Sequence, residues 1–543
     1  MTLLEKAKAW RDQDPDDETR AELDGLIKDA AAGGEHALAE LHDRFETRLE
    51  FGTAGLRGRI EAGSNRMNRV LVAQAAAGFA AYLLARDEHP SVVIGYDGRK
   101  NSRVFATDTA ELMAGAGVRA IILPRLLPTP VLAFAVRHLA VSAGVMVTAS
   151  HNPSNDNGYK VYLGGEDHGS QIVPPADGEI AREIERVASA QSVRQLPRSQ
   201  HYETAGEDVL DEYVRLTASL SSRPTTQLKY VYTAMHGVGW ETAHRVFVDA
   251  GFGEPVVVEK QIEPDPAFPT VAFPNPEEPG ALHLAFDAAR AVQADLVIAN
   301  DPDADRLAVG IPTAAGWERL SGNEVGALLG WRAAEQGAQV LAASIVSSPA
   351  LAAVAKHYGI RYVDTLTGFK WVSRVPGLSY GYEEALGYLV DPGKVRDKDG
   401  ISAAVELIAM VAELAADGTS VTDHRLAFAE KFGAFASSQL SIRVTDLDEI
   451  GHIMQRLRAD LPTAIGGLAV LQVDDFETGV AEFPPSDILR FRLTENSRVI
   501  VRPSGTEPKV KVYLDASGTT SAEAEAIVAA LESTMRSVMA QRP

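Results

Sequence analysis

The loop at residues 148–153, Thr-Ala-Ser-His-Asn-Pro, contains residue types that could do covalent chemistry. It follows an apolar run, residues 143–147, that is typical of a buried strand. Asn152 and Pro153 favour a turn, because proline fixes its own φ and pushes its predecessor out of the helical region. Ser150 is therefore predicted at the end of a strand, a usual place for reactive groups in open α/β sheets. Our hypothesis is that Ser150 is a nucleophile that carries a phosphoryl group; the alternative is an ordinary Ser/Asn/Pro loop.

An acidic loop follows a second strand-like run, residues 295–300. Its carboxylates stand at alternate positions, Asp301, Asp303 and Asp305, and a proline between them prevents a helix. Carboxylate oxygens in this pattern suit a hard divalent cation, so the sequence predicts a Mg²⁺ site. A solvated acidic turn is the alternative, but apolar strands on both sides anchor this backbone. An EF-hand is excluded, because arginine stands where that loop needs glycine and proline where it needs glutamate.

Two basic turns could bind an anion. The first, residues 51–59, places Thr53 and Arg57 among three glycines, so that backbone N–H groups and guanidinium forks can approach a phosphate. The second is Asp97-Gly98-Arg99, which follows a strand-like run. The alternatives are a plain Gly-rich turn for the first and a structural Asp-Gly turn for the second.

Two further stretches could recognise a sugar. One is the turn Thr367-Gly368-Phe369-Lys370, in which a glycine is followed by an ammonium. The other, residues 381–388, places Glu383 and Glu384 between small residues. Carboxylates in such a loop could accept hydrogen bonds from sugar hydroxyls. A charged turn is the alternative reading of the second stretch.

A final motif, residues 502–509, offers several hydrogen-bond donors in a short span. Arg502, Ser504, the amide of Gly505 and Thr506 could converge on one anion, which is what binding of a free phosphate requires. A β-hairpin turn is the alternative. The density of phosphate-type donors favours the functional interpretation.

The elements between these motifs alternate between strand and helix, which indicates parallel, doubly wound sheets. Residues 1–48 carry apolar side chains at helical spacing and are predicted to form a packing arm. Residues 154–160, directly after the Ser150 loop, are polar and predicted to be rich in turns. The proline-rich run 264–279 is either a linker or a rigid loop that leads to a site. His236 is left without a role.

Four domains are expected from the order of these elements. They are residues 1–208, a helical extension and an α/β domain with the Ser150 loop; 209–320, an α/β domain with the metal loop; 321–430, an α/β domain with the sugar loop; and 431–543, an α+β domain with the distal phosphate loop. The last is α+β because its strands follow one another, with one helix after the first strand and one at the end.

Composition limits the classes of partner. At 543 residues the chain is too long for one core and suggests several domains. A net charge of −22 opposes binding to nucleic acid or an anionic membrane, so an anionic substrate needs a local basic pocket. The absence of cysteine excludes disulfides and thiolate chemistry and fits the cytoplasm. We expect no membrane span, because no apolar run approaches the ~20 residues that a span needs, and no signal peptide, because residues 1–20 are charged throughout.

Together these motifs resemble the α-D-phosphohexomutase superfamily from about residue 50 onward. The Ser150 loop is similar to its phosphoserine loop, and Asp301, Asp303 and Asp305 match its Asp-x-Asp-x-Asp metal loop. Residues 383–387 match its sugar-recognition loop, and residues 502–506 its distal phosphate-binding loop. Three other stretches look most like the phosphoglucomutase-2-like branch, namely residues 51–59, 273–277 and 367–370.

The resemblance implies an α/β fold of four domains around a central cleft, three related domains with mixed, mostly parallel sheets and a smaller α+β domain. It also implies that a phosphoryl group on Ser150 passes to a hexose phosphate, gives a 1,6-bisphosphate, and is replaced by the other phosphate. One Mg²⁺ and the cations Arg57, Lys160 and Arg306 would stabilise the concentrated negative charge. Lys160 is the expected general base.

The residues that the resemblance assigns fall into five groups. They are catalytic Ser150, Lys160 and Arg57; the metal ligands Ser150, Asp301, Asp303 and Asp305; substrate-binding Arg306, Thr367, Gly368, Lys370, Glu383 and Ala385; phosphate-binding Arg502, Ser504, Gly505 and Thr506; and the secondary candidates Thr53, Arg99 and His151. Many members of the superfamily carry serine where this chain has Ala385, so the choice of sugar is open.

The leading hypothesis is interconversion of glucose 1-phosphate and glucose 6-phosphate by a monomer or weak homodimer in the cytoplasm. Mannose and pentose phosphates are alternative substrates. Release of a sugar bisphosphate is an alternative outcome of the same chemistry, and a non-catalytic sugar-phosphate binding protein is the third class. Intact Ser150 and three intact metal-loop acids argue against that third class.

Overall fold

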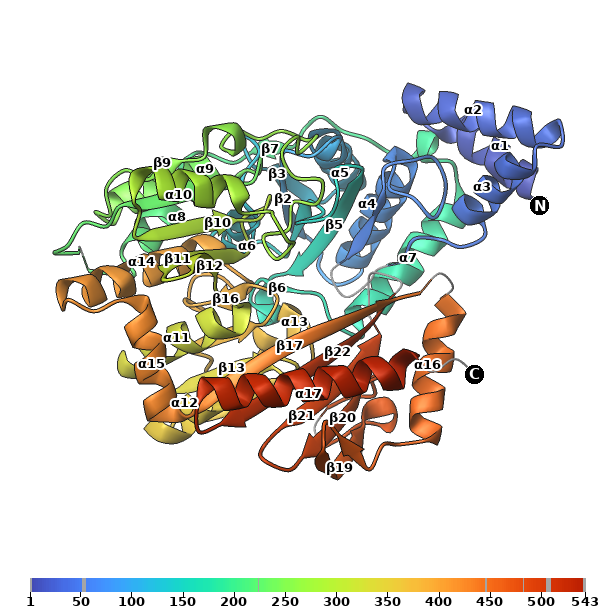
Figure 1. Ribbon diagram of the computed structural model, residues 1–543. Helices are drawn as coiled ribbons and strands as arrows, with labels where there is room; N and C mark the ends of the chain where they lie inside the picture. Colours follow the sequence, from blue (N-terminus) through green and yellow to red (C-terminus); the bar gives the residue numbers. More distant parts are fainter. Residues whose placement is uncertain are drawn as a thin grey trace. The chain divides into compact units, whose positions relative to one another are not determined.

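The computed structural model of this protein describes residues 2–50, 55–222, 224–444, 447–481, 483–503 and 509–540 (Figure 1). The chain divides into two compact units. The first contains Met1–Leu320 and Gly387–Glu413, and the second contains Ser321–Leu386 and Leu414–Pro543. The domain boundaries expected from the sequence are finer than this division and stay predictions.

The N-terminal arm consists of three helices, α1 (Leu3–Gln13), α2 (Asp17–Ala31) and α3 (Glu35–Phe45). Each buries an apolar stripe and exposes its charges, which is the pattern that the sequence predicts. Helices α1 and α2 start at side-chain caps: the Thr2 hydroxyl accepts a hydrogen bond from the Glu5 amide, and the Asp16 carboxylate accepts one from the Glu18 amide. The three helices join the core cluster of the first unit, so the predicted packing arm is confirmed.

The first sheet has the strand order β1-β5-β4-β2-β3-β7, with the two-residue β6 (Ser170–Gln171) beside β5. Its strands are β1 (Leu56–Arg59), β2 (Ser91–Tyr96), β3 (Arg119–Ile122), β4 (Ala143–Val147), β5 (Asp156–Leu163) and β7 (Glu203–Thr204). Pairing is parallel from β4 through β7 and antiparallel from β1 through β4. The helices of this part are α4 (Arg69–Leu84), α5 (Ser102–Ala116), α6 (Thr129–His138), α7 (Ala176–Ala190) and α8 (Asp208–Ala218).

One local prediction is wrong: residues 154–160 are not a run of turns, because most of them lie on β5. This strand pairs with β1 on one side and β4 on the other. Its polar side chains are buried and find partners inside the protein, so hydrophobicity alone could not identify the strand. Gly158 is needed there, since a Cβ would lie 2.6 Å from the Thr148 carbonyl oxygen and 2.7 Å from that of Leu56.

The second sheet also belongs to the first unit and has the order β12-β11-β10-β8-β9. Its strands are β8 (Tyr230–Thr233), β9 (Val256–Val257), β10 (Leu296–Asn300), β11 (Leu307–Thr313) and β12 (Gly316–Arg319), with helices α9 (Gly239–Asp249) and α10 (His283–Val292). The hairpin-like pair β10 and β11 is antiparallel, and the acidic loop connects its two strands. The later segment of this unit supplies β16 (Gly387–Leu389) and most of α14 (Gly400–Ala416).

The second unit contains a parallel sheet and an antiparallel one. The parallel strands are β13 (Val340–Ser344), β14 (Arg361–Thr365) and β15 (Tyr380–Glu383), with α11 (Gly322–Glu335), α12 (Ala350–Tyr358) and α13 (Phe369–Val372). The antiparallel order is β17-β22-β21-β20-β19-β18. Its strands are β17 (Ala434–Arg443), β18 (Ala464–Ile465), β19 (Leu468–Asp475), β20 (Leu489–Leu493), β21 (Arg498–Pro503) and β22 (Lys509–Gly518). The helices α15 (Val421–Phe432), α16 (Leu447–Ala459) and α17 (Ser521–Ala540) complete it, and α17 packs on β17 and β22 (Figure 1).

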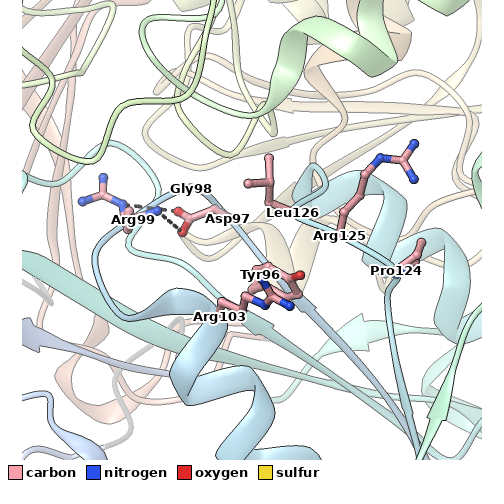
Figure 2. Close-up of a pocket in the computed structure, with 8 residues that line it drawn as sticks. All are labelled: Tyr96, Asp97, Gly98, Arg99, Arg103, Pro124, Arg125 and Leu126. Carbon is pink, nitrogen blue, oxygen red and sulfur yellow. Dashed lines mark hydrogen bonds and ion pairs between the residues drawn. The ribbon is translucent and has the colours of Figure 1, made fainter.

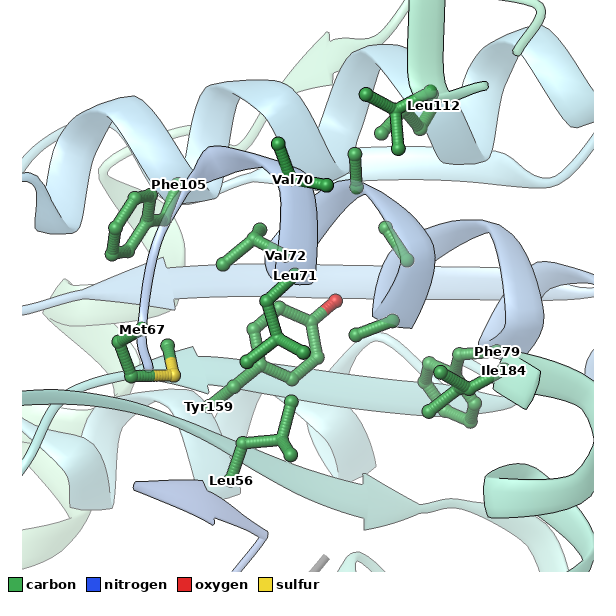
Figure 3. Close-up of a cluster of buried hydrophobic side chains, with 14 of the residues drawn as sticks. Leu56, Met67, Val70, Leu71, Val72, Phe79, Phe105, Leu112, Tyr159 and Ile184 are labelled. Carbon is green, nitrogen blue, oxygen red and sulfur yellow. The ribbon is translucent and has the colours of Figure 1, made fainter. Parts of the chain in front are cut away.

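Helix α4 lies in the core of the first unit. It is apolar on almost all sides, and α5 and α7 pack against it. Figure 3 shows Phe79 of this helix beside Ile184 of α7, with Tyr159 of β5 on the sheet below. All three side chains are buried. An apolar layer of buried side chains therefore packs against one face of the first sheet, whose strands β4 and β5 flank Ser150.

We predict that Phe79→Ala lowers the free energy of unfolding of the first unit by about 3–5 kcal/mol, because it removes a fully buried ring from a closely packed layer. Urea denaturation followed by circular dichroism measures the change. Leu84→Ala on the same helix is the matched control, since Leu84 is 38% exposed and should lose far less. Equal losses in the two variants would contradict this view of the core.

Candidate active site

Ser150 lies in a tight loop between β4 and β5, in the place predicted from the sequence. Its φ is +52°, a left-handed conformation that is uncommon for serine and that the surrounding hydrogen bonds must hold. The Ser150 amide donates to the Thr148 hydroxyl at 2.9 Å, and the Asn152 amide donates to the Ala149 carbonyl at 3.0 Å. The loop therefore presents one hydroxyl in a defined orientation.

The Ser150 hydroxyl contacts the metal loop directly. It donates to Asp301 Oδ2 at 2.8 Å and lies 3.1 Å from His151 Nδ1. These two loops are separated by 151 positions in the chain, and the structure of the first unit brings them together. No carboxylate is hydrogen-bonded to the His151 ring in the part of the chain that the structure describes. The arrangement is consequently not a hydrolytic Ser-His-Asp triad.

The three metal-loop carboxylates, Asp301, Asp303 and Asp305, are completely buried and offer one oxygen each within 4.8 Å of one another. The loop is held from within: the Asp301 carboxylate accepts from the Arg306 amide at 3.0 Å, and the Ala304 amide donates to the Asp301 carbonyl at 2.8 Å. A short bridge to Gly387 anchors Arg306. The alternative of a solvated acidic turn is excluded by this burial.

The acids of this cluster ionise differently. Burial raises the pKa of Asp301 well above its usual range, and the negative charges of Asp303 and Asp305 raise it further. Burial also acts to raise the pKa of Asp303, but the ammonium of Lys160 and its hydrogen bond outweigh burial and lower that pKa below its usual range. A cation bound at this cluster would therefore stabilise the ionised form of Asp301.

The residues present fit a hard divalent cation. Asp303 Oδ1 and Asp305 Oδ1 are buried and have no hydrogen-bond partner among the described residues, an arrangement that costs free energy unless something binds them. Oxygen-only ligands at this spacing are what Mg²⁺ prefers. The fourth predicted ligand, Ser150, is in hydrogen-bond contact with Asp301.

Two lysines lie beside the carboxylates of the metal loop and offset their negative charge. Lys160 Nζ donates to Asp303 at 2.8 Å and to Asp305 at 2.9 Å. Burial acts to lower the pKa of Lys160, but these carboxylates outweigh it and raise the pKa. The ammonium form is therefore favoured, which is the opposite of what a general base needs. Lys398 Nζ lies 3.3 Å from Asp305 and 3.4 Å from Asp397.

Sequence reasoning missed Lys398, although a signal was available. It lies in the charged run 396–399, directly before the long apolar helix α14. The neighbouring Asp397 accepts hydrogen bonds from Tyr162 at 2.8 Å and Gln171 at 2.6 Å, so it is a buried anchor and not a solvated charge. Thr129 was missed too: it binds Asp303 through its amide at 2.9 Å and its hydroxyl at 2.7 Å.

Three further cations predicted from the sequence lie near Ser150. Arg57, on β1, donates to the Asn152 side chain at 3.0 Å. Arg306 Nε lies 3.9 Å from Asp305 and 4.0 Å from Asp301. Burial lowers the pKa of His151 well below its usual value, and the charges of Arg306 and Arg57 lower it further, so the imidazole is neutral. Arg99 is also buried, and its guanidinium donates hydrogen bonds to backbone carbonyl oxygens of the Ser150 loop.

The proline-rich run 264–279 is a rigid loop that reaches the site. The Phe273 ring meets His151 edge to face at 6.0 Å, and the Phe268 ring lies 5.0 Å from the Arg99 guanidinium. His236, left without a role, bonds to Thr270 of this run at 2.7 Å. His236 therefore supports the conformation of this loop.

The predicted sugar loop lies in the second unit. Glu383 ends β15, and Glu384 and Ala385 form the following turn. The Glu384 carboxylate accepts hydrogen bonds from Ser344 at 3.1 Å and Ser347 at 3.2 Å, so it anchors the turn. Glu383, the other of the two paired acids, is the last residue of β15 and is partly buried.

The remaining predicted site residues also belong to the second unit. Thr367 and Gly368 form a bend, with φ of +106° at Gly368, and Lys370 on α13 is buried with its ammonium 5.6 Å from the Trp371 ring. Arg502 lies near the end of β21, which pairs with β22 as a hairpin. Thr53, Ser504, Gly505 and Thr506 lie outside the described residues.

Four family models match this chain in order. They are described as phosphoglucomutase/phosphomannomutase alpha/beta/alpha domain I (residues 48–191), domain II (211–314), domain III (321–431) and the C-terminal domain (442–533). The four-domain α/β architecture expected from the sequence is thereby confirmed, and so is the resemblance on which it rested.

Whole-length relatives carry related names. The chain is 54% identical to a Haemophilus influenzae protein named "Probable phosphomannomutase", over 88% of this chain and 98% of the relative. It is 35% identical to a Schizosaccharomyces pombe "Probable phosphoribomutase" over 95% and 94%, and 34% identical to a Staphylococcus epidermidis "Phosphoglucomutase" over 88% and 92%. A solved structure of a phosphoglucomutase/phosphomannomutase family protein from Burkholderia thailandensis has the same fold (TM-score 0.71, 22% identity, 92% of this chain and 99% of that chain).

We predict that Asp303→Asn weakens Mg²⁺ binding at least about 10- to 100-fold, because it removes a buried charged ligand. Binding should also weaken as the pH falls through the raised pKa of Asp301, since the cation must displace that proton. Isothermal titration of the unphosphorylated protein with MgCl₂ measures both effects. Asp287→Asn, at an exposed carboxylate, is the matched control; equal affinities in the two variants would rule out the site.

Proposed function

The chain belongs to the phosphoglucomutase/phosphomannomutase family and is a phosphomutase of the isomerase class, and we propose that it interconverts the 1-phosphate and the 6-phosphate of a hexose through a phosphorylated Ser150. The observation that carries the proposal is the contact of the Ser150 hydroxyl with Asp301 in a buried carboxylate cluster. A serine in this environment is suited to carry phosphate beside a cation, and no triad activates it for hydrolysis.

The proposed reaction has two matched steps. In the first, a free hydroxyl of the hexose phosphate attacks the phosphorus on Ser150; the new sugar O–P bond forms, the serine O–P bond breaks, and the sugar hydroxyl loses its proton. The resulting 1,6-bisphosphate then turns over. In the second step Ser150 Oγ attacks the other phosphate, and the bond to the sugar oxygen breaks, so that enzyme and phosphate count are restored.

The charged groups around Ser150 define what these steps need. The cations are Arg57, Arg99, Arg306, Lys160 and Lys398, and the carboxylates are Asp97, Asp301, Asp303, Asp305 and Asp397. A dianionic phosphate on Ser150 would place two further negative charges beside these carboxylates. A bound Mg²⁺, held by Ser150 and the three aspartates, would supply the missing positive charge.

The chain's own residues have distinct proposed roles around Ser150. Arg57, attached to Asn152, would position the loop and neutralise the moving phosphoryl group. Lys160 stays our candidate for the general base; its ammonium form is favoured here, so it would give a proton to the departing Ser150 oxygen, and the amine so formed would accept the proton that the sugar hydroxyl loses. In the second step the proton would pass by the same route from the Ser150 hydroxyl to the released sugar oxygen. His151, neutral and 3.1 Å from Ser150 Oγ, is the second group that could accept a proton.

Residues of the second unit would recognise the sugar and its distal phosphate. We propose that Glu383 accepts hydrogen bonds from sugar hydroxyls, while Glu384 fixes the turn through two serines. Thr367, Gly368, Lys370 and Ala385 would complete the sugar site, and Arg502, Ser504, Gly505 and Thr506 would bind the distal phosphate.

Glucose and mannose phosphates are the two candidate hexoses. The relative at 54% identity is named for mannose, and the Staphylococcus epidermidis relative at 34% for glucose. A pentose phosphate is the second class of substrate, favoured by the similarity to the protein named for ribose at 35% identity. Ala385 has no hydroxyl to offer the sugar, which supports a site that discriminates weakly.

No helix in the described residues is long and apolar enough to cross a membrane. A cytoplasmic location, sugar phosphates as partners without nucleic acid or membrane, a monomer or weak homodimer, and a sugar 1,6-bisphosphate as activator are parts of the proposal. They are consistent with a chain that has no cysteine and a net charge of −22.

We predict that Ser150→Ala abolishes mutase activity, because no other hydroxyl in the described site contacts Asp301, while the thermal midpoint stays near that of the unchanged protein. Intact mass spectrometry after incubation with glucose 1,6-bisphosphate should give one added phosphate on the native chain and none on the variant. Substantial residual turnover in the variant would sink the proposal. Persistent release of bisphosphate as the main product would favour the synthase alternative.

A second prediction concerns Ala385→Ser. The added hydroxyl should give the sugar one more hydrogen bond in the transition state and raise discrimination among glucose, mannose and ribose 1-phosphates by about 10-fold or less. Ratios of kcat/KM with activating bisphosphate present measure the change. Ser344→Ala is the control, since it should loosen the turn through Glu384 without adding a sugar contact. Unchanged ratios would place Ala385 outside the sugar site.

A further inference from the structure

Arg99 binds the backbone of the Ser150 loop at four points. Its Nη2 donates to the carbonyl oxygens of Ser150 at 2.6 Å and Asn152 at 2.7 Å. Its Nη1 donates to those of Pro153 at 2.8 Å and Asp156 at 3.2 Å. The side chain is 1% exposed, so these bonds form away from water, where each is strong and costly to lose.

Asp97 fixes the guanidinium from the other side. Its Oδ2 lies 3.3 Å from Arg99 Nε, while its Oδ1 accepts from the Arg99 amide at 3.0 Å and from the Ser102 hydroxyl at 2.6 Å. The Asp97 amide in turn donates to the Val147 carbonyl, at the end of β4, at 3.1 Å. The Asn157 side chain, at the start of β5, donates to Ser102 Oγ at 3.0 Å. The turn 97–102 is thus tied to both strands that flank the loop.

This arrangement has a specific consequence for the reactive serine. Ser150 has a positive φ that serine does not favour, and its own carbonyl is one of the four that converge on Arg99. Without the guanidinium, all four carbonyl oxygens would lose a hydrogen-bond donor, although that of Pro153 would keep the Asp156 amide as a partner. The loop would then relax so that water could replace the lost donors. Lysine could not replace it, because one ammonium cannot span four oxygens as a planar fork does.

We propose that Arg99, held by Asp97, is the positioning residue that keeps Ser150 aligned for phosphoryl transfer. The inference rests on the proposed function for its catalytic part, and on the contacts alone for its structural part. Arg99 touches neither the hydroxyl of Ser150 nor the carboxylates of the metal loop in the bonds described. It acts through the backbone.

Asp97 and Arg99 are among the residues that line a cavity of about 330 Å³, and another arginine of the same cavity offers a matched control. Figure 2 shows the Arg99 side chain directed away from Arg103 and Arg125, which line the same cavity. Arg125 is engaged by Glu207 and Glu241. Within the described residues Arg103 makes no hydrogen bond to the Ser150 loop. Arg103→Met therefore removes an arginine that lines the same cavity and leaves the hydrogen bonds between Arg99 and the loop in place.

The test compares Arg99→Met, Arg99→Lys and Arg103→Met with the native protein. Hydrogen exchange read by mass spectrometry should be faster at residues 148–158 in both Arg99 variants and unchanged in β2, where the core is not affected. Single-turnover transfer from phosphorylated Ser150 to glucose 1-phosphate should slow by about 10- to 100-fold in Arg99→Met, with KM nearly unchanged. Arg99→Lys should recover only part of the rate, and Arg103→Met should match the native protein.

The outcomes separate the two proposals. If the native protein has no mutase activity, the proposed function fails, and exchange at 148–158 still decides whether Arg99 holds the loop. If the native protein is active and Arg99→Met keeps native exchange and native transfer rate, the inference is overturned. Full recovery by Arg99→Lys would overturn it as well, because charge alone and not the fork would then suffice. An Arg99→Met protein that does not fold leaves the Arg99→Lys comparison to decide.

Discussion

The structure depends on one electrostatic constraint: three aspartates of a single loop are buried together beside the hydroxyl of Ser150. Asp301, Asp303 and Asp305 are shielded from water, so their charges repel strongly and raise the pKa of Asp301. Lys160 and Lys398 offset this charge from behind. Two buried carboxylate oxygens, Asp303 Oδ1 and Asp305 Oδ1, still have no hydrogen-bond partner among the described residues, so the cluster could hold a cation.

The fold of the first unit solves the problem by joining segments from two sheets. The Ser150 loop connects β4 and β5, and the metal loop connects β10 and β11, so each reactive loop is gripped by strands at both ends. Thr129 at the start of α6 binds the metal loop by backbone and side chain. The segment Gly387–Glu413 brings Lys398 to the same place. Rigid strand ends are suited to this role because charge must be positioned before the reaction begins.

Particular elements mark where prediction from sequence succeeded and where it could not. The apolar runs at β4 and β10 were located to within a residue, since continuous hydrophobicity bounded by turn residues is a local signal. Strand β5 was missed, because its Asn157 and Lys160 look like surface residues until their buried partners are known. Lys398 was missed for the same reason. Buried polar groups are stabilised by hydrogen-bond partners that are distant in the chain, and the spacing of hydrophobic residues does not identify those partners.

The sequence by itself determined the family and the α/β class and pointed to Ser150 and the three acids, because motif residues and strand periodicity are local properties of the chain. The tertiary structure alone decided which charges meet. Lys160 binds carboxylates that lie 143 and 145 positions further along the chain, and Arg99 binds carbonyls more than 50 positions away. It also placed the Glu384 carboxylate against the hydroxyls of two serines. Such pairings follow from packing, since only a folded backbone brings the partners within hydrogen-bond distance and removes the water that would otherwise compete.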